Sequence, residues 1–121
     1  MRRAVLVCGC LLTSATSLSA GEELAMRVSP LVALAPALLR VQTIVPADAD
    51  NRTLVIIAES SDFFRSSQIP LDGQYAPHVS VFEFPGLPAG LYAVTGILGG
   101  THCERAKVFR RVTVLSSAGA Q

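Results

Sequence analysis

Short apolar runs, separated by proline, glycine and polar turn residues, recur along almost the whole chain. Between 38 and 45 the apolar positions alternate with Arg40 and Gln42, and this period of two predicts a half-buried strand. The run from 53 to 59 is apolar almost throughout, as in a central strand with both faces covered. Further strands are predicted at 31–35, 79–84, 91–98 and 105–115. The weak alternation at 21–29 fits either a first edge strand or an ordered leader, and the polar segment 60–68 fits either a loop or a short crossing strand. About seven strands and no helix predict an all-β sandwich.

In the last predicted strand, the alternation of apolar and polar positions places a charged residue on the inward face. Strict alternation would place Arg110 on the inward face, on the same side as Val108 and Val112. A β-bulge adds one residue to a strand and moves the following side chains to the other face. We therefore expect a bulge at Arg110-Arg111.

The first twenty residues have the pattern of a signal peptide. Arg2 and Arg3 form a positive start, 4–12 is apolar, and small residues follow up to Ala20. An alternative is a lipid-attachment box ending at Cys10, which would anchor the chain to a membrane. No apolar run reaches the ~18 residues of a transmembrane helix. The predicted organisation is a signal peptide at 1–20, one sandwich domain at 21–115 and a disordered tail at 116–121.

Removal of residues 1–20 changes both the charge and the cysteine count. Eight basic residues then remain against nine acidic ones, a net charge of −1 in place of +1. Such a chain has no excess of basic charge with which to bind nucleic acid. Cys8 and Cys10 leave as well, so Cys103 is expected to stand alone, either buried or paired with another chain.

A corner rich in proline and glycine follows the strand at 79–84. It lies in the run Phe84-x-x-Leu87-Pro88-Ala89-Gly90-x-Tyr92-x-Val94, where the tyrosine opens the next strand. The arrangement is typical of a tyrosine corner, in which the phenol hydrogen-bonds to backbone a few residues upstream. Leu87, Gly90 and Tyr92 are therefore predicted to be structural residues.

This corner resembles the same segment of fibronectin type III and bacterial immunoglobulin-like domains, and a similar run occurs in carboxypeptidase-regulatory-like sandwiches. The resemblance implies an immunoglobulin-like sandwich of about seven strands, as in small exported bacterial proteins. These families are usually accessory or adhesive modules, although a fold does not determine a function. The absence of tryptophan and of a cysteine pair argues against an antibody-type domain.

We expect an exported, periplasmic or extracellular, non-catalytic module whose partner is another envelope or extracellular protein. No Gly-x-Ser-x-Gly elbow is present, so neither enzyme activity nor a cofactor is predicted. Interfaces favour exposed aromatic and arginine side chains. The candidates are Phe63, Phe64, Arg65, Tyr75, Arg110 and Arg111. In the structural alternative the aromatic residues cover an open edge of the sandwich, and the arginines protect an edge strand from aggregation.

The alternative function is a carrier of a small ligand or of copper or zinc. Imidazole and thiol groups bind these metals, and His102 and Cys103 are neighbours near the tip of the last hairpin, with His78 elsewhere. A metal site needs three or four converging donors. Adjacent residues on a strand point to opposite faces, so His102 and Cys103 converge only in a turn. These three residues are weak candidates.

Overall fold

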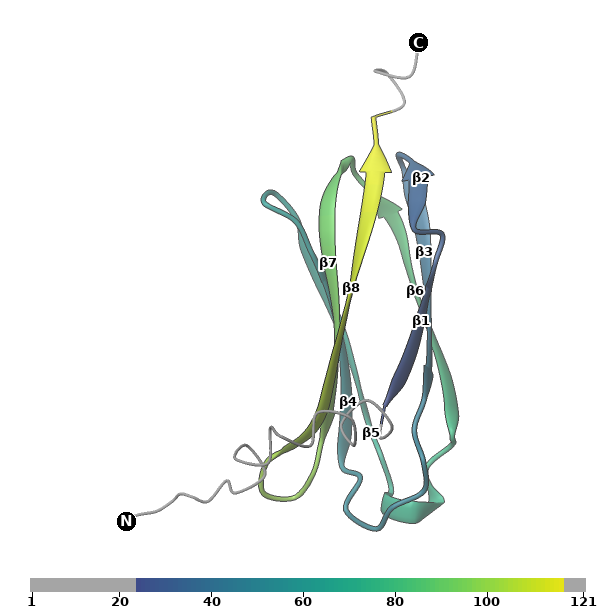
Figure 1. Ribbon diagram of the computed structural model, residues 1–121, viewed down its shortest axis with the longest axis vertical. Coiled ribbons are helices and arrows are strands. Elements are labelled where there is room, and N and C mark those ends of the chain that lie inside the picture. The colour runs from purple at the N-terminus through teal and green to yellow at the C-terminus, as the bar shows by residue number, and fades with distance from the viewer. Residues whose placement is uncertain (1–23, 117–121) are drawn as a thin grey trace, which may run out of the picture.

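The computed structural model describes residues 24–116, which form two β-sheets packed face to face (Figure 1). The predicted signal peptide and the possible lipid anchor at Cys10 lie outside the described residues, as does the predicted tail except for Ser116. The described strands are β1 (Ala25–Ser29), β2 (Val32–Leu34), β3 (Ala37–Ile44), β4 (Thr53–Glu59), β5 (Phe64–Pro70), β6 (Val79–Leu87), β7 (Gly90–Gly99) and β8 (Glu104–Leu115), with a short 3-10 turn η2 (Gly73–Tyr75).

The three-stranded sheet has the order β1-β3-β6, and the five-stranded sheet has the order β2-β8-β7-β4-β5. β1 and β2 follow one another in the chain but belong to different sheets, and Pro30, which cannot donate to a strand ladder, lies between them. β2 is parallel to β8 and pairs only with Thr113, Val114 and Leu115. Within residues 24–116 the rest of β8 is therefore an edge of the five-stranded sheet without a neighbouring strand.

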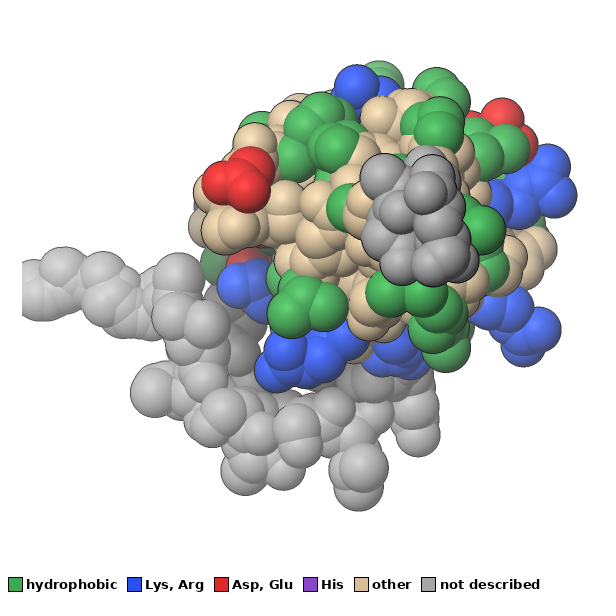
Figure 2. Space-filling view, turned by 90° about the horizontal axis from the view of Figure 1, so that it is seen from above, with side chains coloured by type: hydrophobic (Ala, Val, Ile, Leu, Met, Phe, Trp, Pro, Cys, Tyr) green, Lys and Arg blue, Asp and Glu red, His purple; other side chains and the backbone are tan. Residues whose placement is uncertain are grey.

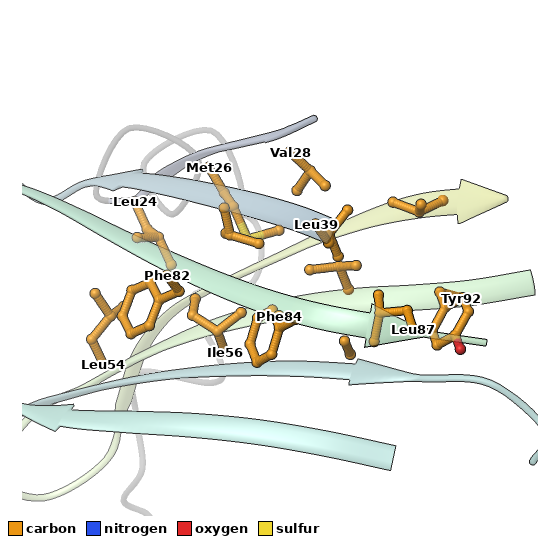
Figure 3. Close-up of a cluster of buried hydrophobic side chains, with 14 of the residues drawn as sticks. Leu24, Met26, Val28, Leu39, Leu54, Ile56, Phe82, Phe84, Leu87 and Tyr92 are labelled. Atoms are coloured by element: carbon orange, nitrogen blue, oxygen red, sulfur yellow. The ribbon is translucent and has the colours of Figure 1, made fainter. Parts of the chain in front are cut away.

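The core lies between the two sheets and follows directly from the alternation along the strands. In β3, Leu39 and Val41 are buried and Arg40 points outward, as the period of two requires. Figure 3 shows Phe82, Phe84, Leu87 and Tyr92 among the aliphatic side chains that fill this space. Within residues 24–116 the buried polar side chains are Thr43 and Asn51.

The all-β prediction is confirmed, with eight strands in place of about seven. The additional strand is β5, in the polar segment for which the sequence left a loop and a short strand open. Its side chains contribute little to the core, so its pattern lacks a strong apolar period. Among the described residues, no helix has the length and apolar character needed to cross a membrane.

The bulge predicted at Arg110-Arg111 is wrong. Val94 pairs with Arg110 and Ala93 pairs with Arg111 in continuous register, and the irregularity of this ladder lies between Leu98 and Gly99. Arg110 keeps its inward position because this part of β8 is a free edge, where the side chain reaches solvent. An inward-pointing charge on an edge strand discourages pairing with another sheet.

Gly96, in the middle of β7, makes room for a side chain from the opposite sheet. A Cβ atom at this position would lie 2.9 Å from the sulfur of Met26 on β1. Gly96→Val should therefore destabilise the domain by about 1–3 kcal/mol, measured by urea unfolding. In combination with Met26→Ala the loss should be smaller than the sum of the two single losses. Simple addition of the two losses would contradict this packing.

Candidate functional site

The corner between β6 and β7 is held by a buried tyrosine. The side chain of Tyr92 is 2% exposed, and its hydroxyl donates a hydrogen bond of 2.7 Å to the carbonyl oxygen of Pro88. Leu87 is fully buried beneath the corner. A Cβ atom on Gly90 would lie 3.3 Å from Cβ of Ser60, so glycine lets the β4–β5 turn approach closely.

Two of the predicted contact residues belong to this corner. The rings of Phe63 and Tyr92 meet edge to face, with centroids 6.2 Å apart at 73°. The guanidinium carbon of Arg65 lies 5.1 Å from the centre of the Phe63 ring, and its Nη1 donates to the carbonyl oxygen of Pro85 at 2.9 Å. Phe63 and Arg65 therefore fix the β4–β5 turn against the corner.

A row of side chains crosses the outer face of the five-stranded sheet beside this turn. Glu59 on β4 pairs with Ala93 on β7, and Ala93 pairs with Arg111 on β8. Directly opposed residues on neighbouring strands share a face of the sheet. The burial pattern places this face outside, since Glu59 and Arg111 are exposed and their neighbours Ala58 and Val112 are buried.

Ala93 leaves a hollow between the two longer side chains of this row. We call it the outer-face hollow. Its volume is about 400 Å³, and it is lined by Glu59, Ser60, Ser61, Leu91, Tyr92, Ala93, Arg111, Val112 and Thr113. Leu91 is 76% exposed, and exposed apolar side chains gather at this end of the molecule (Figure 2). The hollow therefore combines an apolar surface with two opposite charges and several hydroxyl groups.

The two charges of the outer-face hollow are not neutralised by each other. Among residues 24–116 the ion pairs join Arg40 with Glu83 and Arg105 with Asp48 and Asp50. The guanidinium carbon of Arg111 lies 5.3 Å from the centre of the Phe109 ring, two residues earlier on the same face. A cation above a ring is held in place but keeps its charge.

The remaining predicted contact residues lie apart from one another. Phe64 is 62% exposed on β5, directly opposite Glu59. Tyr75 is 79% exposed in η2, near a second hollow whose arginine, Arg52, already donates to the carbonyl oxygens of Ala49 and Asn51. Arg110 lies on the free edge of β8. Of the six residues, Arg111 lines the outer-face hollow and Phe64 lies beside its Glu59.

The three weak metal candidates are not brought together. Nδ1 of His78 lies 3.1 Å from the carbonyl oxygen of Val45, and His102 is exposed in the turn between β7 and β8. Cys103 is disulfide-bonded, and its sulfur is therefore not a free thiolate ligand. The expectation that it stands alone concerns the chain without residues 1–20 and stays a prediction. Within residues 24–116, no group of three or more His, Cys, Asp and Glu side chains could hold a metal ion.

The other residues of the outer-face hollow were missed by the sequence analysis. Glu59 ends an apolar run and Ala93 lies in an apolar strand, and neither has a signal of its own. They come together only through the pairing of β4, β7 and β8, which is set across the sheet. One signal in the sequence could have pointed to the hollow: the alternation of each strand places Glu59 and Arg111 on the face opposite to the core residues.

These features define a small all-β protein of two packed sheets with a hollow on one outer face. No family model matches the sequence, and no curated protein matches it. Among solved structures, the chain is similar to the superoxide reductase (neelaredoxin) of Ignicoccus hospitalis, with 14% identity, a TM-score of 0.55 and coverage of 75% of this chain and 79% of that one. A variant of that protein gives a TM-score of 0.57 at 14% identity, with coverage of 80% and 85%.

The comparisons correct the expectations of family and function. These similar solved structures are superoxide reductases, and the resemblance to fibronectin type III, immunoglobulin-like and carboxypeptidase-regulatory-like domains is therefore wrong. Superoxide reductases are enzymes, and this overturns the expectation of a non-catalytic module that acts through protein contacts. The resemblance rested on about fifteen residues of one corner, and a corner is a local feature that does not fix a family.

At 14% identity the likeness shows the fold alone. Reduction of superoxide requires an electron donor, which proteins usually hold as a metal ion or an organic cofactor. Residues 24–116 do not fit a metal centre, because their His, Cys, Asp and Glu side chains form no group that could hold one. The described part of this chain therefore has no metal site at which the reduction of superoxide could be placed.

The tyrosine corner can be tested by removing one hydroxyl. Tyr92→Phe keeps the ring and deletes the bond to Pro88, so the free energy of unfolding in urea should fall by about 1 kcal/mol. Tyr75→Phe is the matched control, since Tyr75 is exposed, and its stability should stay that of the wild type. Equal stability of both variants would contradict a stabilising bond at the corner.

Burial of the Tyr92 phenol raises its pKa above the ordinary value of 10.0. The unfolded chain then loses this proton at a lower pH than the folded chain. The neutral Tyr92 phenol therefore contributes fully to the free energy of unfolding below pH 10. This contribution is lost as the pH rises through the pKa of the folded state. In Tyr75→Phe, where Tyr92 is the single tyrosine, phenolate absorbance should show a midpoint above 10, which returns to about 10 in urea. A midpoint unchanged by urea would contradict the shift.

Proposed function

We propose that the protein binds a small organic ligand in the outer-face hollow. The observation that carries this proposal is the pair of unneutralised charges, Glu59 and Arg111, on either side of the small side chain of Ala93. The proposal keeps the small-ligand alternative of the sequence analysis but moves the site. His78, His102 and Cys103 have no part in it.

The size and chemistry of the hollow support this proposal. Its volume of about 400 Å³ falls within the roughly 300–1,000 Å³ of small-molecule sites. Leu91 offers an apolar contact, and the hydroxyls of Ser60, Ser61 and Thr113 can each donate and accept hydrogen bonds. A ligand with an apolar body and polar ends would meet suitable groups on every side.

The hollow is also built on parts of the structure that hold their positions. Its floor lies on β7, which is paired with β8 along its length and with β4 from Ala93 to Gly99. Its rim includes Ser60, whose amide donates to the carbonyl oxygen of Phe63 at 2.8 Å within the turn that packs against the corner. Sites on rigid elements lose less entropy when a ligand binds.

The neutral fluorophore N-phenyl-1-naphthylamine tests the site, because its emission rises in an apolar environment. Ala93→Leu fills the hollow and should weaken binding at least about tenfold, which corresponds to 1.4 kcal/mol. Thr95→Leu is the matched control, on the same strand and face but outside the lining of the hollow, and should bind as the wild type does. Equal affinity in both variants, or no binding to the wild type, would contradict the proposed function.

A further inference from the structure

We infer that the ligand of the outer-face hollow is a zwitterion of the size of a short peptide, with its amino group at Glu59 and its carboxylate at Arg111. This inference rests on the proposed function. It adds the chemical class of the ligand, which follows from how far apart the two charges are held and from what lies between them.

A glutamate and an arginine on the other sheet do form an ion pair, and the comparison shows how the arrangement of Glu59 and Arg111 differs. Arg40 and Glu83 lie directly opposite each other on the adjacent strands β3 and β6, and Nη2 of Arg40 meets Oε2 of Glu83 at 3.0 Å. Glu59 and Arg111 occupy one row as well, but β7 lies between their strands. The intervening strand therefore separates the two charges, and they form no ion pair with each other in residues 24–116.

The width of the spacer sets the length of the ligand. Neighbouring strands are about 4.8 Å apart, so the Cα atoms of Glu59 and Arg111 lie about 10 Å from each other. One residue of extended chain spans about 3.5 Å, so a free amino acid is too short to reach both charges. The ring of Phe109 holds the guanidinium of Arg111 over β8, so a dipeptide or tripeptide of about 7–10 Å would bridge the two charges.

The rest of the hollow suits the body of such a ligand. Leu91 lies two residues before Ala93 on the same face and offers 76% of its surface to solvent, which favours an apolar side chain on the ligand. The hydroxyls of Ser60, Ser61 and Thr113 can pair with peptide groups. Phe109 holds the guanidinium of Arg111 by its ring, so the cation is positioned without a competing carboxylate.

The tripeptide Ala-Leu-Ala tests the inference by calorimetry in four forms: with free termini, N-acetylated, C-amidated and capped at both ends. The free form should bind most tightly, and each cap should weaken binding about two- to fivefold, the range of an exposed ion pair. Glu59→Gln should remove the effect of the acetyl group and keep that of the amide. Arg111→Gln should remove the effect of the amide and keep that of the acetyl group.

Arg110→Gln is the matched control, because it removes the neighbouring arginine, which points to the opposite face of β8. It should leave all four affinities unchanged. Equal binding of the free and the doubly capped peptide would overturn the zwitterion while keeping the hollow as a binding site. Failure of every peptide to displace N-phenyl-1-naphthylamine would also overturn it, and the proposed function would still stand on the fluorophore's dependence on Ala93.

Discussion

The hydrogen bond from the Tyr92 hydroxyl to the Pro88 carbonyl oxygen fixes the corner beside which the outer-face hollow lies. It closes the corner at which the chain leaves the three-stranded sheet and enters the five-stranded one. Because the ring is buried, this bond ties the start of β7 to the corner. Phe63 and Ser60 pack against the same corner, so the bond also positions the turn that borders the outer-face hollow.

The outer-face hollow in turn depends on the order of the strands. Long side chains of opposite charge on adjacent strands can form an ion pair, as Arg40 and Glu83 do. A third strand with a small residue between two such side chains prevents that contact and leaves a gap. Ala93 is therefore as important for the hollow as the two charges, since a large side chain in its place would fill the gap.

The sequence was sufficient where the interacting residues are close in the chain. The alternation from 38 to 45 predicted β3, and the residues of the corner lie within about ten positions of each other, so both could be found without a structure. β5 was uncertain because it lies at a sheet edge and buries little. The bulge at Arg110 was wrong, since the sequence cannot show that this part of β8 has no neighbouring strand. The hollow was missed because register across three strands is not a local property.

At 14% identity the likeness to superoxide reductases is a likeness of fold. In β7, Val94 and Leu98 are fully buried, and any two-sheet protein of this kind requires apolar side chains at such positions. Leu91 and Ala93 alternate with them and face outward, where packing places almost no demand on the residue. Two proteins can therefore share the inner face and the fold while their outer faces carry unrelated chemistry. The function of this chain is therefore better sought in its outward residues than in the fold.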